Sequence, residues 1–205
     1  MNTNEKVINK LLSYGHNKQI PQVIKQPALK ALSFYPDLKH AVIRFNFKTN
    51  IRTSVMQAQP VFSTLLRKQE NRRYRINISR HFKLKSCDMA ITEIPEEVMV
   101  GWIVHELGHI VDYEHRSNAA IALFGLRYVL SPEYVKVAER VADTYAVERG
   151  SGQYILATKR FILDHADISP EYKNKIKRLY LSPDIIVDLV KKLEEKKKNL
   201  KVEDL

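Results

Sequence analysis

Cysteine is almost absent from this chain of 205 residues, since Cys87 is the only one. A single cysteine excludes an intramolecular disulfide and a cluster of metal-binding thiolates. Long apolar runs are also missing, and none approaches the length that spans a membrane. The segment 1–6 leads into no long apolar stretch and has no small-residue cleavage site, so we expect no signal peptide. These absences predict a cytoplasmic protein without a membrane span.

Acidic residues are in short supply: 23 Asp and Glu stand against 34 Lys and Arg, which gives a formal net charge of +11. Such a charge favours acidic partners without identifying one. Hydrophobic residues make up 44% of the chain and charged residues 28%, a balance typical of folded globular proteins. We therefore expect one domain over residues 1–205. The sequence does not indicate its oligomeric state.

The first 94 residues predict two short helices followed by a small sheet. The helices fall within residues 1–36, at 6–14 and 27–35. In the sheet-rich part, residues 37–94, apolar and polar side chains alternate over 43–47 and again over 74–78. This alternation is the pattern of half-buried strands. A weaker alternation over 82–84 indicates a third strand, and the pattern of 61–68 fits a helix.

The remaining part, residues 95–198, has a helical pattern throughout. Ser131, Ser169 and Ser182 are each followed by a proline and an acid, an arrangement that favours helix starts. The predicted helices span residues 95–115, 117–130, 132–149, 153–165, 170–180 and 183–198. We therefore predict an α+β fold with a small N-terminal mixed or antiparallel sheet and a helical C-terminal half.

The helix predicted at 95–115 contains the pattern H-E-x-x-H, made by His105, Glu106 and His109. Histidines four residues apart lie on one face of a helix. Such a pair can offer two imidazole nitrogens to one Zn²⁺, with the glutamate placed as a base on a metal-bound water. Gly108 costs about 0.5–1 kcal/mol relative to alanine inside a helix. Its presence predicts the close approach of another backbone or of a substrate.

A catalytic zinc takes three protein ligands, and the sequence offers two candidates for the third. The first is His115, which extends the pattern to H-E-x-x-H-x-x-D-x-x-H and resembles the metzincin motif. That family, however, has glycine at the position of Asp112 and a methionine turn further on. No methionine follows the helix here. We therefore favour the second candidate, Glu139.

Glu139 and Asp143 are four residues apart on a later predicted helix and are flanked by apolar residues. Together with the segment His105–His109 they resemble the gluzincin metallopeptidases, which carry H-E-x-x-H on one helix and E-x-x-A-D on a later one. The resemblance implies a zincin-like fold in which the sheet packs on the active-site helix. It implies that Glu139 is the third zinc ligand and that Asp143 accepts a hydrogen bond from a ligand histidine.

The same resemblance implies the activity. Zn²⁺ bound by His105, His109 and Glu139 is expected to activate a water that hydrolyses a peptide or protein substrate, with Glu106 as general base. Such families add a side chain that stabilises the oxyanion. The candidates for this role are Tyr145, Arg160 and His165. These families also place an edge strand beside the site, where it pairs with extended substrate, and we expect Arg73–Ser79 to be that strand.

Residues 67–85 carry eight Lys and Arg against one Glu. We interpret them as a strand with a solvated basic face; the alternative is a rim that selects acidic peptides or binds nucleic acid. No recognised nucleic-acid motif accompanies the stretch, so a non-catalytic nucleic-acid-binding protein ranks below the peptidase. A third alternative is a regulatory intracellular protease similar to the ImmA/IrrE family. That family often has A-N-x-F-A after its glutamate, where this chain has Ala142–Ala146 with Asp and Tyr.

Overall fold

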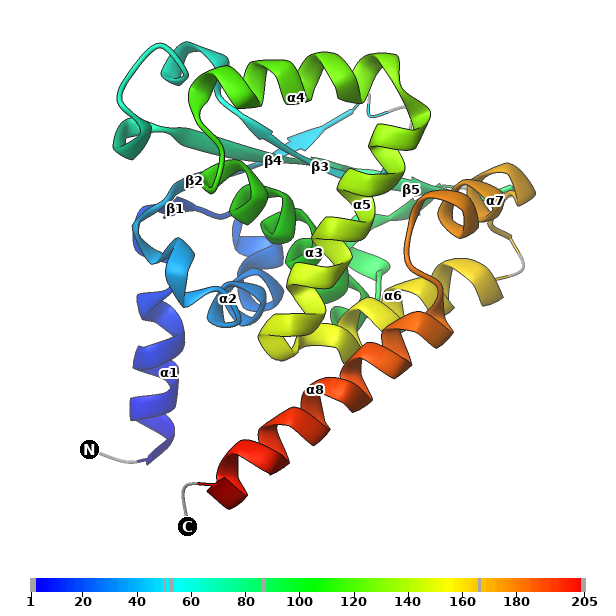
Figure 1. Cartoon of the computed structure of the whole chain (residues 1–205). Helices are drawn as coiled ribbons and strands as arrows, with labels where there is room; N and C mark the ends of the chain where they lie inside the picture. Colours follow the sequence, from blue (N-terminus) through cyan, green and yellow to red (C-terminus); the bar gives the residue numbers. More distant parts are fainter. Residues whose placement is uncertain (1–2, 50, 52–53, 86–87, 166, 204–205) are drawn as a thin grey trace.

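The structure is a computed structural model that describes residues 3–49, 51, 54–85, 88–165 and 167–203, so Cys87 lies outside the described residues. The fold is α+β with a small mixed sheet and a helical C-terminal half, as predicted. The long helix α3, Glu96–Glu114, lies at the centre. The sheet and the helix α2, Lys25–Ser33, pack on one side of it, and the helices α5, Pro132–Ala146, and α6, Gly152–Asp164, pack on the other (Figure 1).

The main sheet has four strands in the order β1-β2-β4-β3. Strand β2 pairs in parallel with both β1 and β4, whereas β3 is antiparallel to β4. The strands are β1 Lys18–Gln19, β2 Val42–Lys48, β3 Met56–Pro60 and β4 Arg73–Ser79. The strands predicted from the alternation at 43–47 and 74–78 are therefore confirmed. Their buried sides contribute Ile43, Phe45, Tyr74, Ile76 and Ile78 to the core.

The prediction that Arg73–Ser79 is the edge strand is wrong. β4 is paired on both sides, and the edge beside α3 is β3. β3 does alternate, since Met56, Ala58 and Pro60 are buried and the two glutamines between them are half-buried. Alanine and proline are poor strand formers, which hid this strand in the sequence. Pro60 fits an edge because its missing N–H is not needed there.

The weaker sheet signals have a mixed outcome. The third predicted strand forms as β5, His81–Lys83, which pairs with β6, Asp88–Ala90, in a separate two-stranded sheet. The helix predicted at 61–68 is wrong, because only a 3-10 turn forms there, at Phe62–Thr64.

The remaining helices agree with the predictions to within a few residues at most ends. They are α1 Thr3–Ser13, α4 Asn118–Leu130, α5 Pro132–Ala146, α6 Gly152–Asp164, α7 Pro170–Leu179 and α8 Pro183–Glu203. Ser131 and Ser169 cap α5 and α7 through their hydroxyls, as their Ser-Pro-acid pattern predicts. The helix predicted to 149 ends earlier, because a turn over Val147–Ser151 contains Gly150 at φ 83°. Glycine adopts such a left-handed conformation at little cost.

Two glycines allow α3 to lie close to its neighbours. A Cβ at Gly108 would lie 2.6 Å from the carbonyl oxygen of Ala142 in α5. A Cβ at Gly101 would lie 2.2 Å from the carbonyl oxygen of Tyr154 in α6. The predicted close approach of another backbone at Gly108 is therefore confirmed. α5 and α6 are thus held tightly against α3.

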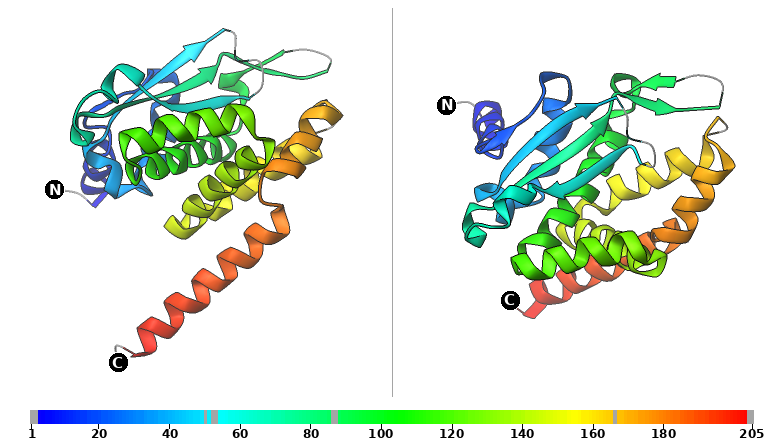
Figure 2. Two further views of the ribbon diagram at one scale, coloured as in Figure 1. Left: turned by 45° about the horizontal axis from the view of Figure 1, so that its top comes forward. Right: turned by 90° about the horizontal axis from the view of Figure 1, so that it is seen from above.

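Figure 2 shows the layers from two further directions, with the sheet on one side, α3 and α4 beneath it, and α5 and α6 beyond them. The C-terminal part of α8 extends away from this body. Among its described side chains, those that join the core lie in the first turns: Ile186 is buried, and Leu189 and Val190 pack against the core. Within the described ranges, no helix combines the length and apolar character needed to cross a membrane.

Candidate metal centre

Three predicted ligands meet where α3 crosses α5. His105 Nε2 lies 3.0 Å from Glu139 Oε2, and His109 Nε2 lies 3.5 Å from the same oxygen. The ligand atoms of the three side chains all lie within 4.8 Å of one another. All three residues are buried, at 4–7% exposure. The crossing at Gly108 allows this meeting, because it brings α5 into contact with the face of α3 that carries both histidines.

The spacing fits a small tetrahedral ion. Ligand atoms bound at about 2.0–2.1 Å around such an ion lie about 3.3 Å from one another. The two distances to Glu139 Oε2 fall on either side of that value. Two imidazoles and one carboxylate are also the donor set of many catalytic zinc sites. The residues present therefore fit Zn²⁺.

Asp143 occupies the place predicted for it, one turn beyond Glu139. The Nδ1–H of His105 donates to Asp143 Oδ1 at 2.9 Å. This hydrogen bond directs the opposite nitrogen, Nε2, towards Glu139 and His109. Fixing the tautomer and ring orientation in this way is a common property of metal-binding histidines.

Lys159 is a member of the site that sequence reasoning missed. Its ammonium group lies 3.1 Å from Asp143 Oδ2, and both residues are buried. The backbone N–H of Leu181 donates to the same oxygen at 3.1 Å. The ammonium also lies 3.9 Å from the centre of the Tyr180 ring, a cation–π contact. A buried cation therefore balances the aspartate that orients His105.

Glu106 is held by the edge strand. The backbone N–H of Ala58 in β3 donates to Glu106 Oε2 at 2.5 Å. Burial raises the pKa of this carboxyl group, and the nearby His109 and His105 offset only part of that effect. A carboxylate whose pKa is raised holds a transferred proton more readily at neutral pH. Glu106 is therefore suited to act as a general base.

The electrostatics of the cluster favour a cation. Burial alone would raise the pKa of Glu139, but the charge on His109 and the hydrogen bond with His105 hold it well below its ordinary value. Burial alone would lower the pKa of His105, but Asp143 and Glu139 raise it to about 10 through hydrogen bonds and charge. Two buried carboxylates thus stabilise positive charge at this histidine. The same field favours a bound metal cation.

The structure excludes His115 from the cluster. His115 is exposed at the C-terminal end of α3, and its Nδ1 lies 3.1 Å from the hydroxyl of Tyr145. Asp112, which stands where metzincins have glycine, instead forms an ion pair with Arg116 at 2.9 Å. α3 therefore continues past Asp112, and the favoured third candidate, Glu139, is the one that lies beside the histidines.

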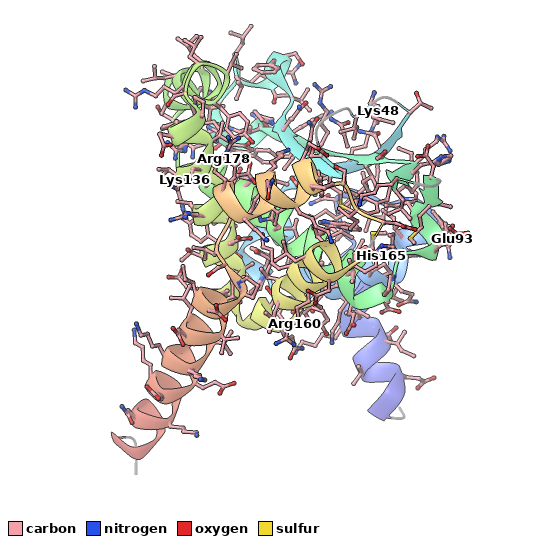
Figure 3. The ribbon with its side chains drawn as sticks, turned by 90° about the vertical axis from the view of Figure 1, so that its right-hand side faces the viewer. Lys48, Glu93, Lys136, Arg160, His165 and Arg178 are labelled. Atoms are coloured by element: carbon pink, nitrogen blue, oxygen red, sulfur yellow. The ribbon has the colours of Figure 1, made fainter. Side chains whose placement is uncertain are left out.

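The cluster opens into a cavity of about 740 Å³ between β3, α4, α5 and α7. Glu106, His109 and Glu139 form part of its lining. A cavity of this size is typical of ligand and substrate sites. The expected oxyanion groups Tyr145, Arg160 and His165 are not among the lining residues. Arg160 lies on α6 and His165 directly follows it, on the flank of the molecule that Figure 3 shows.

Other polar side chains line the cavity in their place. The Tyr128 hydroxyl donates to Glu139 Oε1 at 2.5 Å, and the ring of Tyr180 lies 5.3 Å from that of His105. Lys175 lines the same space. No local motif pointed to these three residues, because α4 and α7 reach the site only through tertiary packing.

One residue of the basic stretch 67–85, Arg72, has a structural role. Arg72 is buried and donates to the carbonyl of Tyr113 and to Asn118 Oδ1, both at 2.6 Å. It therefore ties the start of β4 to the connection between α3 and α4. Other basic residues of the stretch are exposed, which agrees with a solvated face: Arg67, Lys68, Arg73, Arg80 and Lys85. Within the described part of 67–85, no residue lines the cavity.

No protein-family model, curated protein or solved structure matches this chain.

Proposed function

We propose that this protein is a zinc-dependent metallopeptidase with a zincin-like, gluzincin-type site. The observation that carries the proposal is the meeting of His105, His109 and Glu139 beside Glu106 at the wall of one cavity. Any of these residues alone would be unremarkable on a helix. Their convergence from two helices, in a donor set that fits Zn²⁺, supports a metal site.

His105, His109 and Glu139 would hold the zinc ion. When bound, Zn²⁺ supplies a Lewis acid that polarises a carbonyl group and lowers the pKa of a water. Glu106 takes up the proton of the attacking water and passes it to the leaving amine, so that the peptide bond is hydrolysed. The Ala58 N–H keeps its carboxylate in place for both transfers. Asp143 and Lys159 hold His105 from behind.

The cavity supplies the groups that a tetrahedral oxyanion needs. Tyr180 and Lys175 line it and carry a hydroxyl and an ammonium donor, whereas the hydroxyl hydrogen of Tyr128 is donated to Glu139. We assign the oxyanion-stabilising role to Tyr180 and Lys175 in place of Tyr145, Arg160 and His165. Partly enclosed surroundings also strengthen each electrostatic interaction with the substrate.

Metal analysis and one substitution test the proposal. Protein purified without chelator should contain about one zinc per chain and should hydrolyse a fluorescently labelled, unfolded protein. Glu106→Gln should retain the zinc but lose activity by about 10²–10⁴-fold, since only the base is removed. A metal-free protein that cannot be reloaded with zinc would overturn the proposal. So would a Glu106→Gln variant that hydrolyses the substrate at the rate of the unaltered protein.

A further inference from the structure

The walls of the cavity are apolar on both sides of the metal cluster. One wall is the edge strand β3 and the other is α4, which has no role in the metal site apart from Tyr128. Their apolar contributions include Met56, Ala58 and Pro60 from β3 and Ile121, Phe124 and Leu126 from α4. A substrate in this space therefore meets hydrocarbon on two sides.

The rim of the cavity is apolar as well, and it is exposed. Phe62 stands just after β3 with 65% of its surface exposed, whereas Leu126 and Val129 stand on α4 at 57% and 81%. All three line the cavity. Large apolar side chains gathered around one opening are typical of a surface that another molecule covers. Covering these side chains would stabilise a complex, because each Å² of apolar surface removed from water contributes about 25 cal/mol of favourable free energy.

Charged groups are scarce in the same lining. Among the described residues that line the cavity, Lys175 is the only basic one besides the proposed ligand His109, and Glu106 and Glu139 are the only acidic ones. The positive net charge of the chain is therefore carried largely outside the cavity. An acidic substrate side chain would lose its hydration here with few cations to replace it. The lining thus disfavours the acidic substrates that the net charge favours.

α4 leaves a recess at Gly125. This glycine lines the cavity, and no atom lies within 4 Å of where a Cβ would be. Glycine in the middle of a helix costs about 0.5–1 kcal/mol relative to alanine, yet no neighbouring backbone in the described structure requires it here. Gly108 and Gly101 differ in this respect, because each is needed for a helix contact. The space at Gly125 is open to an occupant.

The outer edge of β3 meets that occupant mainly through side chains. The Val61 N–H donates to the Arg73 carbonyl and the Ser79 N–H donates to the Val55 carbonyl, so the backbone groups of the odd-numbered residues of β3 face β4. The backbone groups of Met56, Ala58 and Pro60 therefore face away from β4. Because the Ala58 N–H is already donated to Glu106 and proline has no N–H, β3 presents mainly its apolar side chains to the cavity.

We propose that the cavity selects polypeptide segments with a bulky apolar side chain, and that Gly125 is the specificity-determining residue that makes room for it. This inference rests on the proposed peptidase function and names its substrate class. The apolar side chain would lie against α4 between Phe124 and Val129, while the neighbouring part of the segment contacts the apolar side chains of β3. The exposed rim residues would then be covered by the rest of the segment.

Peptides that differ at a single position test this proposal. The probes are capped peptides of about eight residues, built from glycine, serine and alanine, with phenylalanine, leucine, alanine or aspartate at one central position. We expect kcat/KM to be at least about tenfold higher with phenylalanine or leucine than with alanine, and lowest with aspartate. Equal rates for all four, or a preference for aspartate, would overturn the proposal.

Gly125→Leu tests the recess itself. The new side chain should fill the space, so the ratio of kcat/KM between the phenylalanine and alanine peptides should fall by about tenfold or more. Ala119→Leu is the matched control, because position 119 lies on the same helix, is exposed and does not line the cavity. The control should keep the ratio of the unaltered protein. A Gly125→Leu variant with an unchanged ratio would show that Gly125 does not determine specificity.

A binding measurement separates this proposal from the proposed function. In Glu106→Gln, fluorescence anisotropy of labelled probes reports binding without cleavage. Preferential binding of the phenylalanine peptide, lost in Glu106→Gln combined with Gly125→Leu, supports the apolar recess even if no peptide is ever hydrolysed. Hydrolysis without any preference for apolar side chains would support the proposed peptidase function but refute the proposed role of Gly125 in specificity. Binding of all four probes with the same affinity would refute that role as well.

Discussion

The ammonium nitrogen of Lys159 lies 3.1 Å from Oδ2 of Asp143, in the interior behind the metal cluster. The other oxygen of the aspartate accepts a hydrogen bond from His105. A buried carboxylate without a cation is costly, and burial alone lowers the pKa of the lysine while Asp143 opposes that effect. Each group thus depends on the other. The orientation of His105 in α3 is therefore linked to a lysine in α6.

Lys159→Met should destabilise the fold and weaken zinc binding together. Removing one member of a buried ion pair costs about 3–5 kcal/mol. Because Asp143 then orients His105 less firmly, zinc affinity should fall by about 10–100-fold. Urea unfolding and titration against a competing chelator measure the two effects. Lys136→Met is the control, since the half-buried Lys136 pairs with the exposed Glu133 at 3.7 Å on the surface of α5, and its loss should change the free energy of unfolding by less than about 1 kcal/mol.

The double variant of Lys159→Met and Asp143→Asn shows whether the charges act as a pair. Once both charges are gone, the unfolding free energy should exceed that of Lys159→Met alone, because no unpaired buried charge remains. Zinc affinity should nevertheless stay low, since the charged partner of His105 is missing. Additive losses of stability in the double variant would contradict the pairing.

Gly108→Ala and Gly125→Ala should change the free energy of unfolding in opposite directions, although the substitution is the same. The new methyl group at 108 would lie 2.6 Å from a backbone oxygen of α5, so the two helices must separate. For Gly108→Ala we expect the free energy of unfolding to fall by about 1–3 kcal/mol. Zinc binding should also weaken, because Glu139 moves with α5. At position 125 the methyl group meets no atom within 4 Å. Gly125→Ala should therefore raise the free energy of unfolding by about 0.4–1 kcal/mol. Thermal unfolding measures both, and stabilisation by Gly108→Ala would refute the close crossing.

The local parts of the site could be predicted from the sequence. His105 and His109 share a helix face because of their spacing alone, and Glu139 and Asp143 share another for the same reason. The apolar flanks placed both helices in the interior, which favoured their packing against each other. Gly108 indicated the close approach of another backbone or of a substrate, and the structure shows that it is the backbone of α5. The structure brings these residues together as that reasoning predicted.

The parts of the site that depend on tertiary packing could not be predicted in the same way. Lys159 lies on the buried stripe of α6 with Ile155 and Ile162, and a lysine on an apolar stripe is the one signal that pointed inward. Nothing local, however, identifies Asp143 as its partner. The order of the strands is a similar case. Alternation found β4, but its central place depends on pairing with β3, a strand that alanine and proline made hard to recognise.

Removal of the third ligand should distinguish Glu139 from His115. Zinc that binds only the folded state raises the unfolding temperature in proportion to RT ln(1 + [Zn]/Kd). Glu139→Ala should abolish most of this shift, because it deletes a carboxylate 3.0 and 3.5 Å from the two histidines. His115→Ala should keep the shift, because His115 is exposed and contacts Tyr145. Differential scanning fluorimetry with and without zinc gives the answer, and the reverse order would favour the metzincin-like geometry.

Tyr128→Phe should weaken zinc binding without removing a ligand. The Tyr128 hydroxyl donates to Glu139 Oε1, which leaves Oε2 directed at the histidines. Without that donor the carboxylate is free to rotate, so zinc affinity should fall by about tenfold, while the unfolding free energy of the metal-free protein should fall by only about 1 kcal/mol. Tyr145→Phe is the control, because its hydroxyl contacts His115 outside the cluster. If competition titration gives both variants the affinity of the unaltered protein, then Glu139 is oriented by α5 alone, and Tyr128 serves only the cavity.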